Sequence, residues 1–467
     1  HYVSGFDELY EAVKPFTLQY TEHRTTCAAA DIVEAARIFA TAKSGAAASG
    51  TGLHMARHQN LTTQLVQTLN ALCGRFDRRG GMARIAGTLG PKLPSEGNSP
   101  LSVSMRTEQR SRVRDIQGIT GLFGYQEMPT NTLADEILTP GKGQVKALIV
   151  NGGNPALVFS DTDHTLKALE ELDLLVVNDL FMSATARHAD YVMAVTHPFE
   201  RVDIPMLSDN YYPFSFNQYS EKMVEPQDDV IEEWEFFWRA AQRMGSGFSL
   251  PGIDADDAPT ADEVIRALTP SARISLQELK DAPASGRVYD AGIPEVGGVI
   301  PDMIGHADRR LAAGHPEVIA ELAEVYAEPV LIGGAYREGQ NFDFRLITYR
   351  MPEVYCTTGN NLPSLRRKRQ YNPALMSRED MARLSLSDED LVTIESGHGK
   401  IEAVVECSDK VARGTIGLAH GWGDPADPRP TREKGSNVQQ LIPRDVDFDK
   451  VTGLAQQSAF AVNVYPV

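Results

Sequence analysis

The chain has 467 residues, of which 42% are hydrophobic and 23% charged, and its formal net charge is −18. This length is enough for about two to four domains with cores of their own. The acidic balance excludes a general nucleic-acid-binding protein, which would need a basic face to neutralise phosphates. No run reaches the ~18 apolar residues of a membrane helix.

The N-terminal end of the sequence reads as the middle of a domain. It starts with histidine and continues directly into a helical pattern, so we expect further sequence upstream, with any targeting peptide included in it. The four cysteines, Cys27, Cys73, Cys356 and Cys407, are too scattered for a zinc or iron–sulfur motif. We expect them to be mostly buried, reduced thiols.

Helical periodicity opens the chain. Residues 31–43 place apolar side chains at helical spacing behind Asp31, a suitable N-cap. The run "SGAAASGTGL" and the periodic segment "NLTTQLVQTLNALCGRF" predict a strand, a glycine turn and a helix that ends at Gly74. We assign residues 1–45 to the end of a preceding α/β domain. Residues 85–135 show weak periodicity and are interpreted as long loops with short helices.

A sharper pattern begins at residue 145. The strand "VKALIV", the turn "NGGNP", a helix over about 161–171 and the strand "DLLVVND" are followed by a helix and a strand in "FMSATARHADYVMAV". Apolar strands alternating with helices indicate a doubly wound α/β domain whose mostly parallel sheet is covered on both faces. Residues 228–244 predict one more helix. We assign 46–250 to this nucleotide-binding domain.

The last part of the chain changes character. Residues 251–326 are acidic and contain prolines, and we interpret them as a helical or irregular insertion. From 327 to 467 short β-rich runs alternate with Gly, Asp and Pro turns, which is typical of an all-β barrel. The predicted architecture is therefore an α/β domain followed by a barrel.

The turn at 151–155 carries the first functional signal. Gly152 and Gly153 let a ligand approach the main chain, Asn154 offers a donor and an acceptor, and Pro155 can open the next helix. Ligands of doubly wound sheets lie beyond the carboxyl ends of the strands. An ordinary tight turn between strand and helix explains the same residues.

Several motifs taken in order are more specific than this turn. "NGGNPA", "LDLLVVNDLFMSATARHADYVMAV" and "VEPQDDVIEEW" precede a β-rich tail with "ITYR", "GSNVQQL" and "DKVTGLAQQSAFAVNV". In this order they resemble the molybdopterin oxidoreductases of the dimethyl sulfoxide reductase and formate dehydrogenase type. The resemblance covers nearly the whole chain, although 85–135 and 251–325 match poorly. It implies a double-psi barrel and a molybdenum or tungsten ion held by two pterin guanine dinucleotides.

The resemblance also implies roles for residues of the α/β part. Gly50 and Gly52 resemble the turn against which one pterin pyrophosphate lies, and Gly152, Gly153 and Asn154 resemble the next wall of that site. Asn178 and Asp179 match the position that takes ribose hydroxyls. Glu233 falls where the family places a carboxylate against the guanine edge, whose two N–H donors adenine lacks. A turn, a helix cap and a solvated helix face are the ordinary alternatives.

In the tail, Arg350 resembles an arginine that reaches the pterin region, and Asn437 and Gln457 match polar positions that contact the pterins. A surface ion pair is the alternative for Arg350. The run "RRKR" at 366–369 is either a basic loop in solvent or a region that draws anionic groups toward the cleft.

Three departures from the family pattern stand out. The cysteine cluster for a [4Fe–4S] centre and the side chain that ligates the metal are both missing from the sequence. Met193-Ala194 replaces the usual Leu-Pro. Arg84 lies where formate-oxidising members have an arginine over the metal, in different surroundings, so Arg84 and His54 are weak candidates and no general base is assigned.

The sequence thus predicts the C-terminal part of a molybdenum or tungsten bis-pterin oxidoreductase, inactive by itself. The [4Fe–4S] centre and the metal ligand would belong to an N-terminal part or a companion chain, with an electron-transfer subunit and a small-molecule substrate as further partners. A metal-free scaffold subunit of an electron-transfer complex is the alternative. An NAD-dependent Rossmann enzyme is disfavoured, because no G-x-G-x-x-G follows a strand. Both cytoplasmic and exported members of the family exist.

Overall fold

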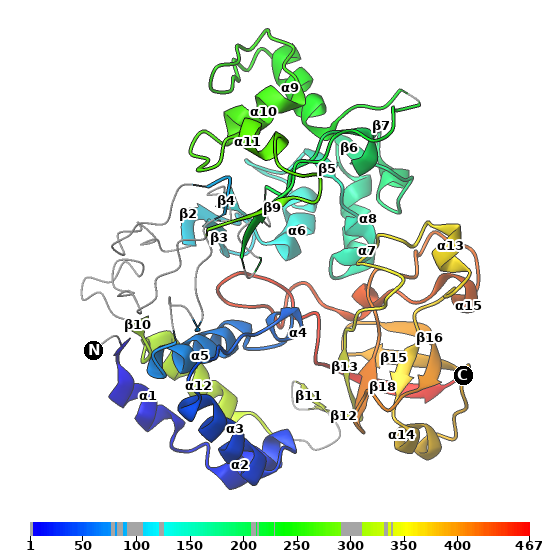
Figure 1. Ribbon diagram of the computed structural model, residues 1–467. Coiled ribbons are helices and arrows are strands. Elements are labelled where there is room, and N and C mark those ends of the chain that lie inside the picture. Colours follow the sequence, from blue (N-terminus) through cyan, green and yellow to red (C-terminus); the bar gives the residue numbers. More distant parts are fainter. Residues whose placement is uncertain are drawn as a thin grey trace.

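The structure is a computed structural model that describes residues 3–75, 80–81, 87–90, 106–120, 126–206, 212, 214–227, 229–290, 311–330, 335–337 and 340–467. Figure 1 shows an N-terminal group of helices, a parallel sheet, a lobe beside that sheet and a C-terminal barrel. Arg84 lies outside the described residues. Among the helices that are described, none is long and apolar enough to cross a membrane.

The N-terminal group combines segments from two regions of the sequence. Its core contains Leu9, Leu61 and Leu322, so residues predicted as the end of the 251–326 insertion pack here. The elements are β1 (Val3–Ser4), α1 (Phe6–Val13), α2 (Leu18–Thr25), α3 (Ala29–Thr41), α4 (Thr51–His54), α5 (Gln59–Leu72), β10 (Leu311–Ala312) and α12 (Pro316–Ala327), with β1 and β10 paired in parallel.

The strand predicted in "SGAAASGTGL" does not form, and residues 45–50 adopt no regular secondary structure and pair with no described strand. The side chain of the buried Asn70 takes the place of a partner strand. Its Nδ2 donates to the Ala47 carbonyl at 2.7 Å, and its Oδ1 accepts from the Ala47 N–H at 2.8 Å. One amide side chain therefore satisfies both main-chain groups that a strand would have paired.

The parallel sheet has the order β5 (Ala147–Asn151), β6 (Leu174–Asp179), β7 (Tyr191–Ala194). α7 (Pro155–Val158) and α8 (Thr162–Glu170) follow β5, and α6 (Leu133–Leu138) packs on α8. The helix predicted between β6 and β7 is only the 3-10 turn η2 (Ala186–His188). Coverage of both faces was expected, but Ile149, Leu174 and Tyr191 are exposed among the described residues.

A lobe follows the sheet in the chain. Trp238 of α9 (Glu233–Arg243) is buried in its core. α9 begins later than the predicted 228–244 helix. The lobe also contains η3 (Pro198–Glu200), β8 (Ser215–Asn217), α10 (Ala261–Leu268), α11 (Leu276–Lys280) and β9 (Arg287–Tyr289). A separate antiparallel sheet consists of β2 (Arg106–Arg110), β3 (Gln117–Thr120) and β4 (Gln126–Glu127). The turn η1 (Thr130–Thr132) follows this sheet in the chain.

The C-terminal part is a closed barrel with strand order β13-β17-β14-β16-β15-β18, which confirms the predicted barrel. Its strands are β13 (Phe344–Ile347), β14 (Ala374–Met376), β15 (Leu391–Ser396), β16 (Lys400–Cys407), β17 (Thr415–Gly417) and β18 (Phe460–Pro466). Alternate residues point inward, as in β15, where Val392 and Ile394 are fully buried. Outside the barrel lie β11 (Ala335–Arg337), β12 (Gln340–Phe342), α13 (Pro363–Arg366), α14 (Arg378–Arg383), α15 (Thr431–Lys434) and η5 (Val438–Leu441).

The cysteines are free, as expected, but they are not buried. Cys27 is exposed, and Cys73, Cys356 and Cys407 are partly exposed. Cys73 caps the C-terminus of α5, and Cys356 occupies a turn with a φ of 56°. The cap and turn positions of Cys73 and Cys356 keep these two side chains near the surface.

An ionic network joins the sheet to the barrel. Arg444, which follows η5, contacts Asp161 at the start of α8 at 2.7 Å and Asp135 of α6 at 3.1 Å. His398 of the β15–β16 turn lies 3.4 Å from Asp161, and Arg114 pairs with Asp135. Both carboxylates are nearly buried, so the network holds the two parts of the molecule in a fixed relation.

Acid should weaken this junction through Asp161. Burial would raise its pKa, but hydrogen bonds and charges from His398 and Arg444 outweigh burial and lower the pKa to about 2. Because the pKa is lower in the folded than in the unfolded chain, the stabilisation is complete above about pH 4 and is lost as the pH falls toward 2, an effect of about 2 kcal/mol.

The Asp161→Asn variant tests this pH dependence, since asparagine still caps α8. Its free energy of unfolding, measured in urea, should fall less than that of the wild type between about pH 5 and pH 3. Asp163→Asn, an exposed change in the same helix, should follow the wild type. Identical pH profiles for the two variants would contradict the assignment.

Candidate functional site

The carboxyl edge of the parallel sheet brings together residues that are far apart in the sequence. Gly152 has a φ of +60°, a conformation that favours glycine, and its N–H donates to the Asn178 carbonyl at 2.9 Å. A Cβ at Gly152 would lie 3.7 Å from Oε1 of Glu233, the first residue of α9. The turn and the carboxylate therefore face the same space.

Two further polar side chains lie at this edge. Asn178 is fully buried and donates from Nδ2 to Oδ1 of Asn151 at 3.1 Å, while its own Oδ1 has no partner in the described part of the chain. Asp179 accepts the Phe181 N–H at 3.1 Å through Oδ1 and stays partly exposed. The edge thus offers a carboxylate and an unused buried acceptor to a ligand that donates hydrogen bonds.

Asn154 has a structural task in this turn. Its Oδ1 accepts from the main-chain N–H of Thr185 at 3.1 Å and from the Thr185 hydroxyl at 2.8 Å. The Thr185 hydroxyl in turn receives the Ala156 N–H at 3.1 Å. Asn154 is buried and clamps the turn to the segment after β6, so it fixes the position of Gly152 and Gly153.

A second group of predicted residues lies where the N-terminal helices meet the barrel. Gly50 precedes α4 and Gly52 lies within it, and a Cβ at either position meets no described atom within 4 Å. The N–H groups of Gln457 and Ser458 both donate to the carbonyl of Met55, each at 2.9 Å. The α4 turn and the C-terminal loop of the barrel are therefore neighbours.

Arg350 is close to this second group. The Ser458 hydroxyl accepts the N–H of Thr348, two residues before Arg350, at 3.2 Å. The Arg350 guanidinium stacks on Tyr355 at 4.4 Å and lies 3.4 Å from the Cys356 sulfur. Burial, followed by the charge of Arg350, lowers the pKa of His420. Arg350 forms no ion pair with any described residue, so the surface ion pair considered from the sequence is not observed there.

Asn437 and His54 make local contacts. Asn437 is buried, donates to the Thr162 hydroxyl at 3.2 Å and accepts the Gln439 N–H at 3.0 Å. It ties the barrel to α8. His54 Nε2 lies 2.8 Å from the Ser49 hydroxyl. Among the described residues, no group of three or more His, Cys, Asp or Glu is placed to hold a metal ion.

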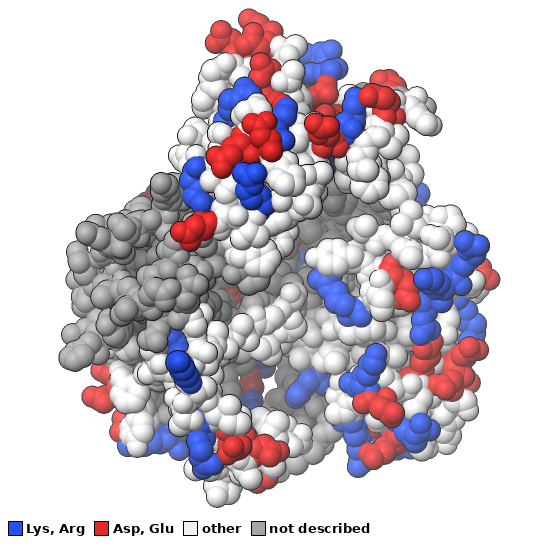
Figure 2. Space-filling view, in the orientation of Figure 1, with Lys and Arg blue, Asp and Glu red and all other residues white. Residues whose placement is uncertain are grey.

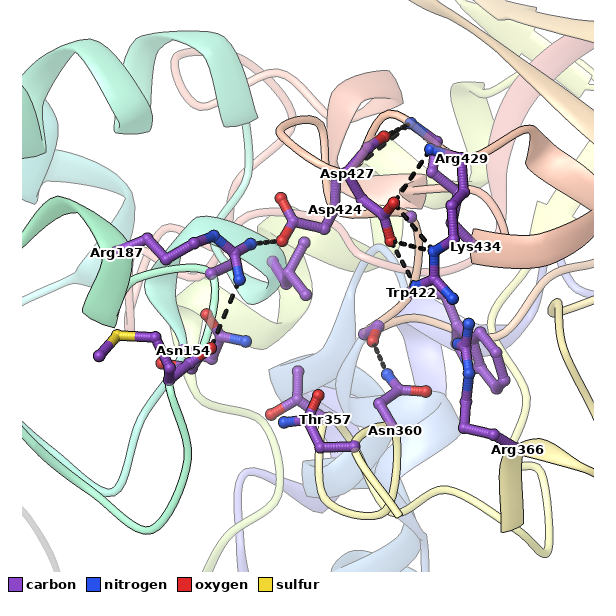
Figure 3. Close-up of a pocket in the computed structure, with 17 residues that line it drawn as sticks. Asn154, Arg187, Thr357, Asn360, Arg366, Trp422, Asp424, Asp427, Arg429 and Lys434 are labelled. Atoms are coloured by element: carbon purple, nitrogen blue, oxygen red, sulfur yellow. Dashed lines mark hydrogen bonds and ion pairs between the residues drawn. The ribbon is translucent and has the colours of Figure 1, made fainter. Parts of the chain in front are cut away.

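A pocket of about 150 Å³ lies between the sheet and the barrel (Figure 3). Asn154 and Arg187 line it from the sheet side, and residues of two barrel connections, β13–β14 and β17–β18, line it from the other side. Sequence reasoning had considered Asn154 and, as part of "RRKR", Arg366. It missed the other polar residues of the wall, which are Ser183, Arg187, Thr357, Asn360, Asn361, Trp422, Asp424, Asp427, Arg429 and Lys434.

The charges in this pocket are mixed, with cations in excess. Arg187 pairs with Asp424 across the pocket, and Arg429 pairs with Asp427 with Nε–Oδ distances of 3.0 Å. The hydrogen bond from Arg429, more than any other cause, lowers the pKa of Asp427 to about 2.

Arg366 and Lys434 form no ion pair with a carboxylate of the described residues. Arg366 donates to the Glu433 carbonyl and stacks on Trp422 at 5.5 Å, while Lys434 donates to the Asp427 carbonyl at 2.7 Å. Trp422 is buried, and its ring N–H has no partner in the described chain. Two cations and an unused donor make the pocket suitable for an anionic ligand.

Comparison with known proteins identifies two family models that together include the sheet and the barrel. Residues 28–242 match the model of the family "Molybdopterin oxidoreductase", and residues 344–459 match "Molydopterin dinucleotide binding domain". The trimethylamine-N-oxide reductase of Haemophilus influenzae is 24% identical over 80% of this chain and 49% of its own length. Formate dehydrogenase H of Escherichia coli is 24% identical over 90% of this chain and 57% of its own length.

A solved structure shares the fold. The acetylene hydratase from Pelobacter acetylenicus superposes with a TM-score of 0.75 at 20% identity, over 100% of this chain and 67% of its own. The chain spans about half the length of the curated relatives named above. Both family models describe molybdopterin proteins and together cover most of the chain. The chain therefore belongs to the molybdopterin oxidoreductase family of the dimethyl sulfoxide reductase type.

Proposed function

We propose that this chain is the C-terminal part of a molybdenum or tungsten oxidoreductase and provides one guanine dinucleotide site together with the barrel that closes over the pterins. The observation that carries the proposal is the proximity of Glu233 to Gly152, with 3.7 Å between the carboxylate and the position of a Cβ at the glycine. A bare main-chain turn beside a carboxylate accommodates a base that has two N–H donors on one edge.

The residues present fit such a cofactor. Asn178 Oδ1 is a buried acceptor without a described partner, and Trp422 Nε1 is a buried donor without one. The pocket between sheet and barrel has four cationic side chains and two carboxylates in its wall, which suits a diphosphate. When bound, the metal–pterin group supplies the electron-pair chemistry, and the protein binds, orients and tunes it.

Each residue then has a defined task. Glu233 accepts hydrogen bonds from the guanine edge, and Asp179 accepts from ribose hydroxyls. Arg366 and Lys434, whose present partners are carbonyl groups and a ring, face the phosphates. Gly50, Gly52, Arg350 and Gln457 form the second contact region, beside the pterins.

Catalysis needs a metal ligand, which we assign to an N-terminal part or a companion chain, together with the iron–sulfur centre that the resemblance to the family implies. The four cysteines of this sequence are far apart, whereas a [4Fe–4S] centre takes four thiolates. The expected activity is oxygen-atom or hydride transfer coupled to an electron pair. The purified chain by itself should not turn over an artificial electron acceptor.

Analysis of the native complex tests the proposal. Acid hydrolysis should release guanosine monophosphate, and mass spectrometry should find molybdenum or tungsten in the same peak of a gel-filtration column. A complex with neither would favour the alternative, a scaffold subunit that keeps the fold without the cofactor. Adenosine monophosphate in place of guanosine monophosphate would contradict the role of Glu233.

A further inference from the structure

A basic surface lies on the barrel, on a chain whose overall charge is strongly negative. It is formed by residues 363–370 and 429–434, which contain seven lysine or arginine residues and a single acidic residue, Glu433. Figure 2 shows these blue side chains gathered over α13 and α15. The two segments are about sixty residues apart in the sequence, so the fold creates the surface, and "RRKR" supplies four of its seven basic residues.

This basic surface is hollowed. An open depression of about 400 Å³ is lined by Pro363, Arg366, Arg367, Gln370, Arg429 and Glu433. Arg366 and Arg429 also line the pocket between the sheet and the barrel. They therefore form a wall with the cofactor pocket on one side and the hollow on the other. Burial and the nearby charge of Arg429 lower the pKa of Arg366, which agrees with two guanidinium groups held close together.

Several cationic side chains of the basic surface have no interaction partner among the described residues. Arg367, Lys368 and Arg432 are exposed, and their side chains form no hydrogen bond or ion pair with any described residue. Arg369 is different, since it pairs with Glu406 at 2.7 Å, and Arg429 pairs with Asp427. These three unpaired cations, of which Arg367 lines the hollow, leave a local positive potential that a structural role does not explain.

We propose that this basic surface docks a carboxylate-rich segment of a partner protein, with Arg367, Lys368 and Arg432 as the main contacts. The planar guanidinium groups match carboxylates, which they bind through paired hydrogen bonds. The basic surface is confined to residues 363–370 and 429–434, and this limited extent favours a short acidic segment over larger anionic partners. A nucleic acid or an anionic membrane extends past the surface and meets the rest of a protein with net charge −18, whereas a short acidic segment does not.

The affinity of this surface for its partner should depend on whether the cofactor pocket is occupied, because Arg366 and Arg429 line both the pocket and the hollow. A second anion in the hollow shares their positive field with the phosphates in the pocket, so the two ligands influence one another electrostatically. This coupling rests on the proposed function, but the docking itself does not. The docking experiment below therefore uses the chain without cofactor.

The test compares two charge-reversal variants that change the net charge equally. The first is Arg367→Glu/Lys368→Glu/Arg432→Glu, which leaves every residue that lines the cofactor pocket in place. The second is Lys43→Glu/Lys142→Glu/Lys410→Glu, at exposed positions elsewhere. The probe is a fluorescein-labelled peptide of eight glutamates, measured by fluorescence anisotropy at low ionic strength. Circular dichroism checks that both variants are folded.

The peptide should bind the wild type and the control variant with similar affinity. Its affinity for the surface variant should be lower by about tenfold or more. Affinity should fall as salt is added. Equal losses in both variants would show a general charge effect and overturn the proposal. So would absence of binding to the wild type, or tighter binding of single-stranded RNA or phosphatidylserine vesicles than of the peptide.

Discussion

Replacing Arg444 by methionine should lower the free energy of unfolding by about 3 kcal/mol, since the guanidinium group joins two carboxylates that are nearly buried. Methionine keeps much of the apolar stem of the side chain, so the change is mainly one of charge and hydrogen bonding. Among the described residues, Asp161 would keep His398 at 3.4 Å and Asp135 would keep Arg114. Both nearly buried carboxylates would lose a charged partner, and this cost falls on the junction between the sheet and the barrel.

The measurement is urea unfolding followed by tryptophan fluorescence, because Trp422 reports on the barrel and Trp238 on the lobe beside the sheet. Arg413→Met, an exposed change on the barrel, serves as the control and should alter stability by no more than about 0.5 kcal/mol. Similar losses in the two variants would mean that Arg444 adds nothing beyond an ordinary surface arginine.

The sequence predicts this fold best where one pattern determines one element. The strands that end at Asn151 and Asp179 are continuous apolar runs, and parallel strands bring their carboxyl ends to one edge. The barrel follows from short alternating strands. The strand predicted around Ala47 failed for a different reason. The main-chain N–H and carbonyl of Ala47 are hydrogen-bonded to the Asn70 side chain, and such a contact cannot be predicted from hydrophobic periodicity.

The site shows the same limit. Glycine at 152 and the polar ends of two strands could be found from local patterns, but Glu233 was placed only by the resemblance to a family. Arg187, Asp424 and Trp422 went unnoticed because they meet in a pocket made by the contact of sheet and barrel. That contact depends on the ion pairs around Arg444, which join residues about three hundred positions apart in the chain.

Changing Glu233 to glutamine should reverse the base preference of the nucleotide site. The carboxylate accepts two hydrogen bonds and so suits guanine, whose edge has two adjacent N–H donors. An amide has one donor and one acceptor, which is the complement of the adenine edge. Because hydrogen bonds to charged groups contribute about 1.5–3 kcal/mol each, loss of one should weaken guanine binding roughly 10- to 100-fold.

Isothermal titration of the chain with guanosine diphosphate and adenosine diphosphate gives the ratio of the two affinities. The wild type should favour the guanine nucleotide, and Glu233→Gln should favour the adenine nucleotide or show no preference. Glu235→Gln, two residues further along α9, removes a carboxylate that pairs with Arg239 on the helix surface and should keep the wild-type ratio. A ratio that is the same in all three proteins would place the base away from Glu233, whatever the total affinity. The ratio is the decisive quantity, because a loss of folding weakens both nucleotides alike.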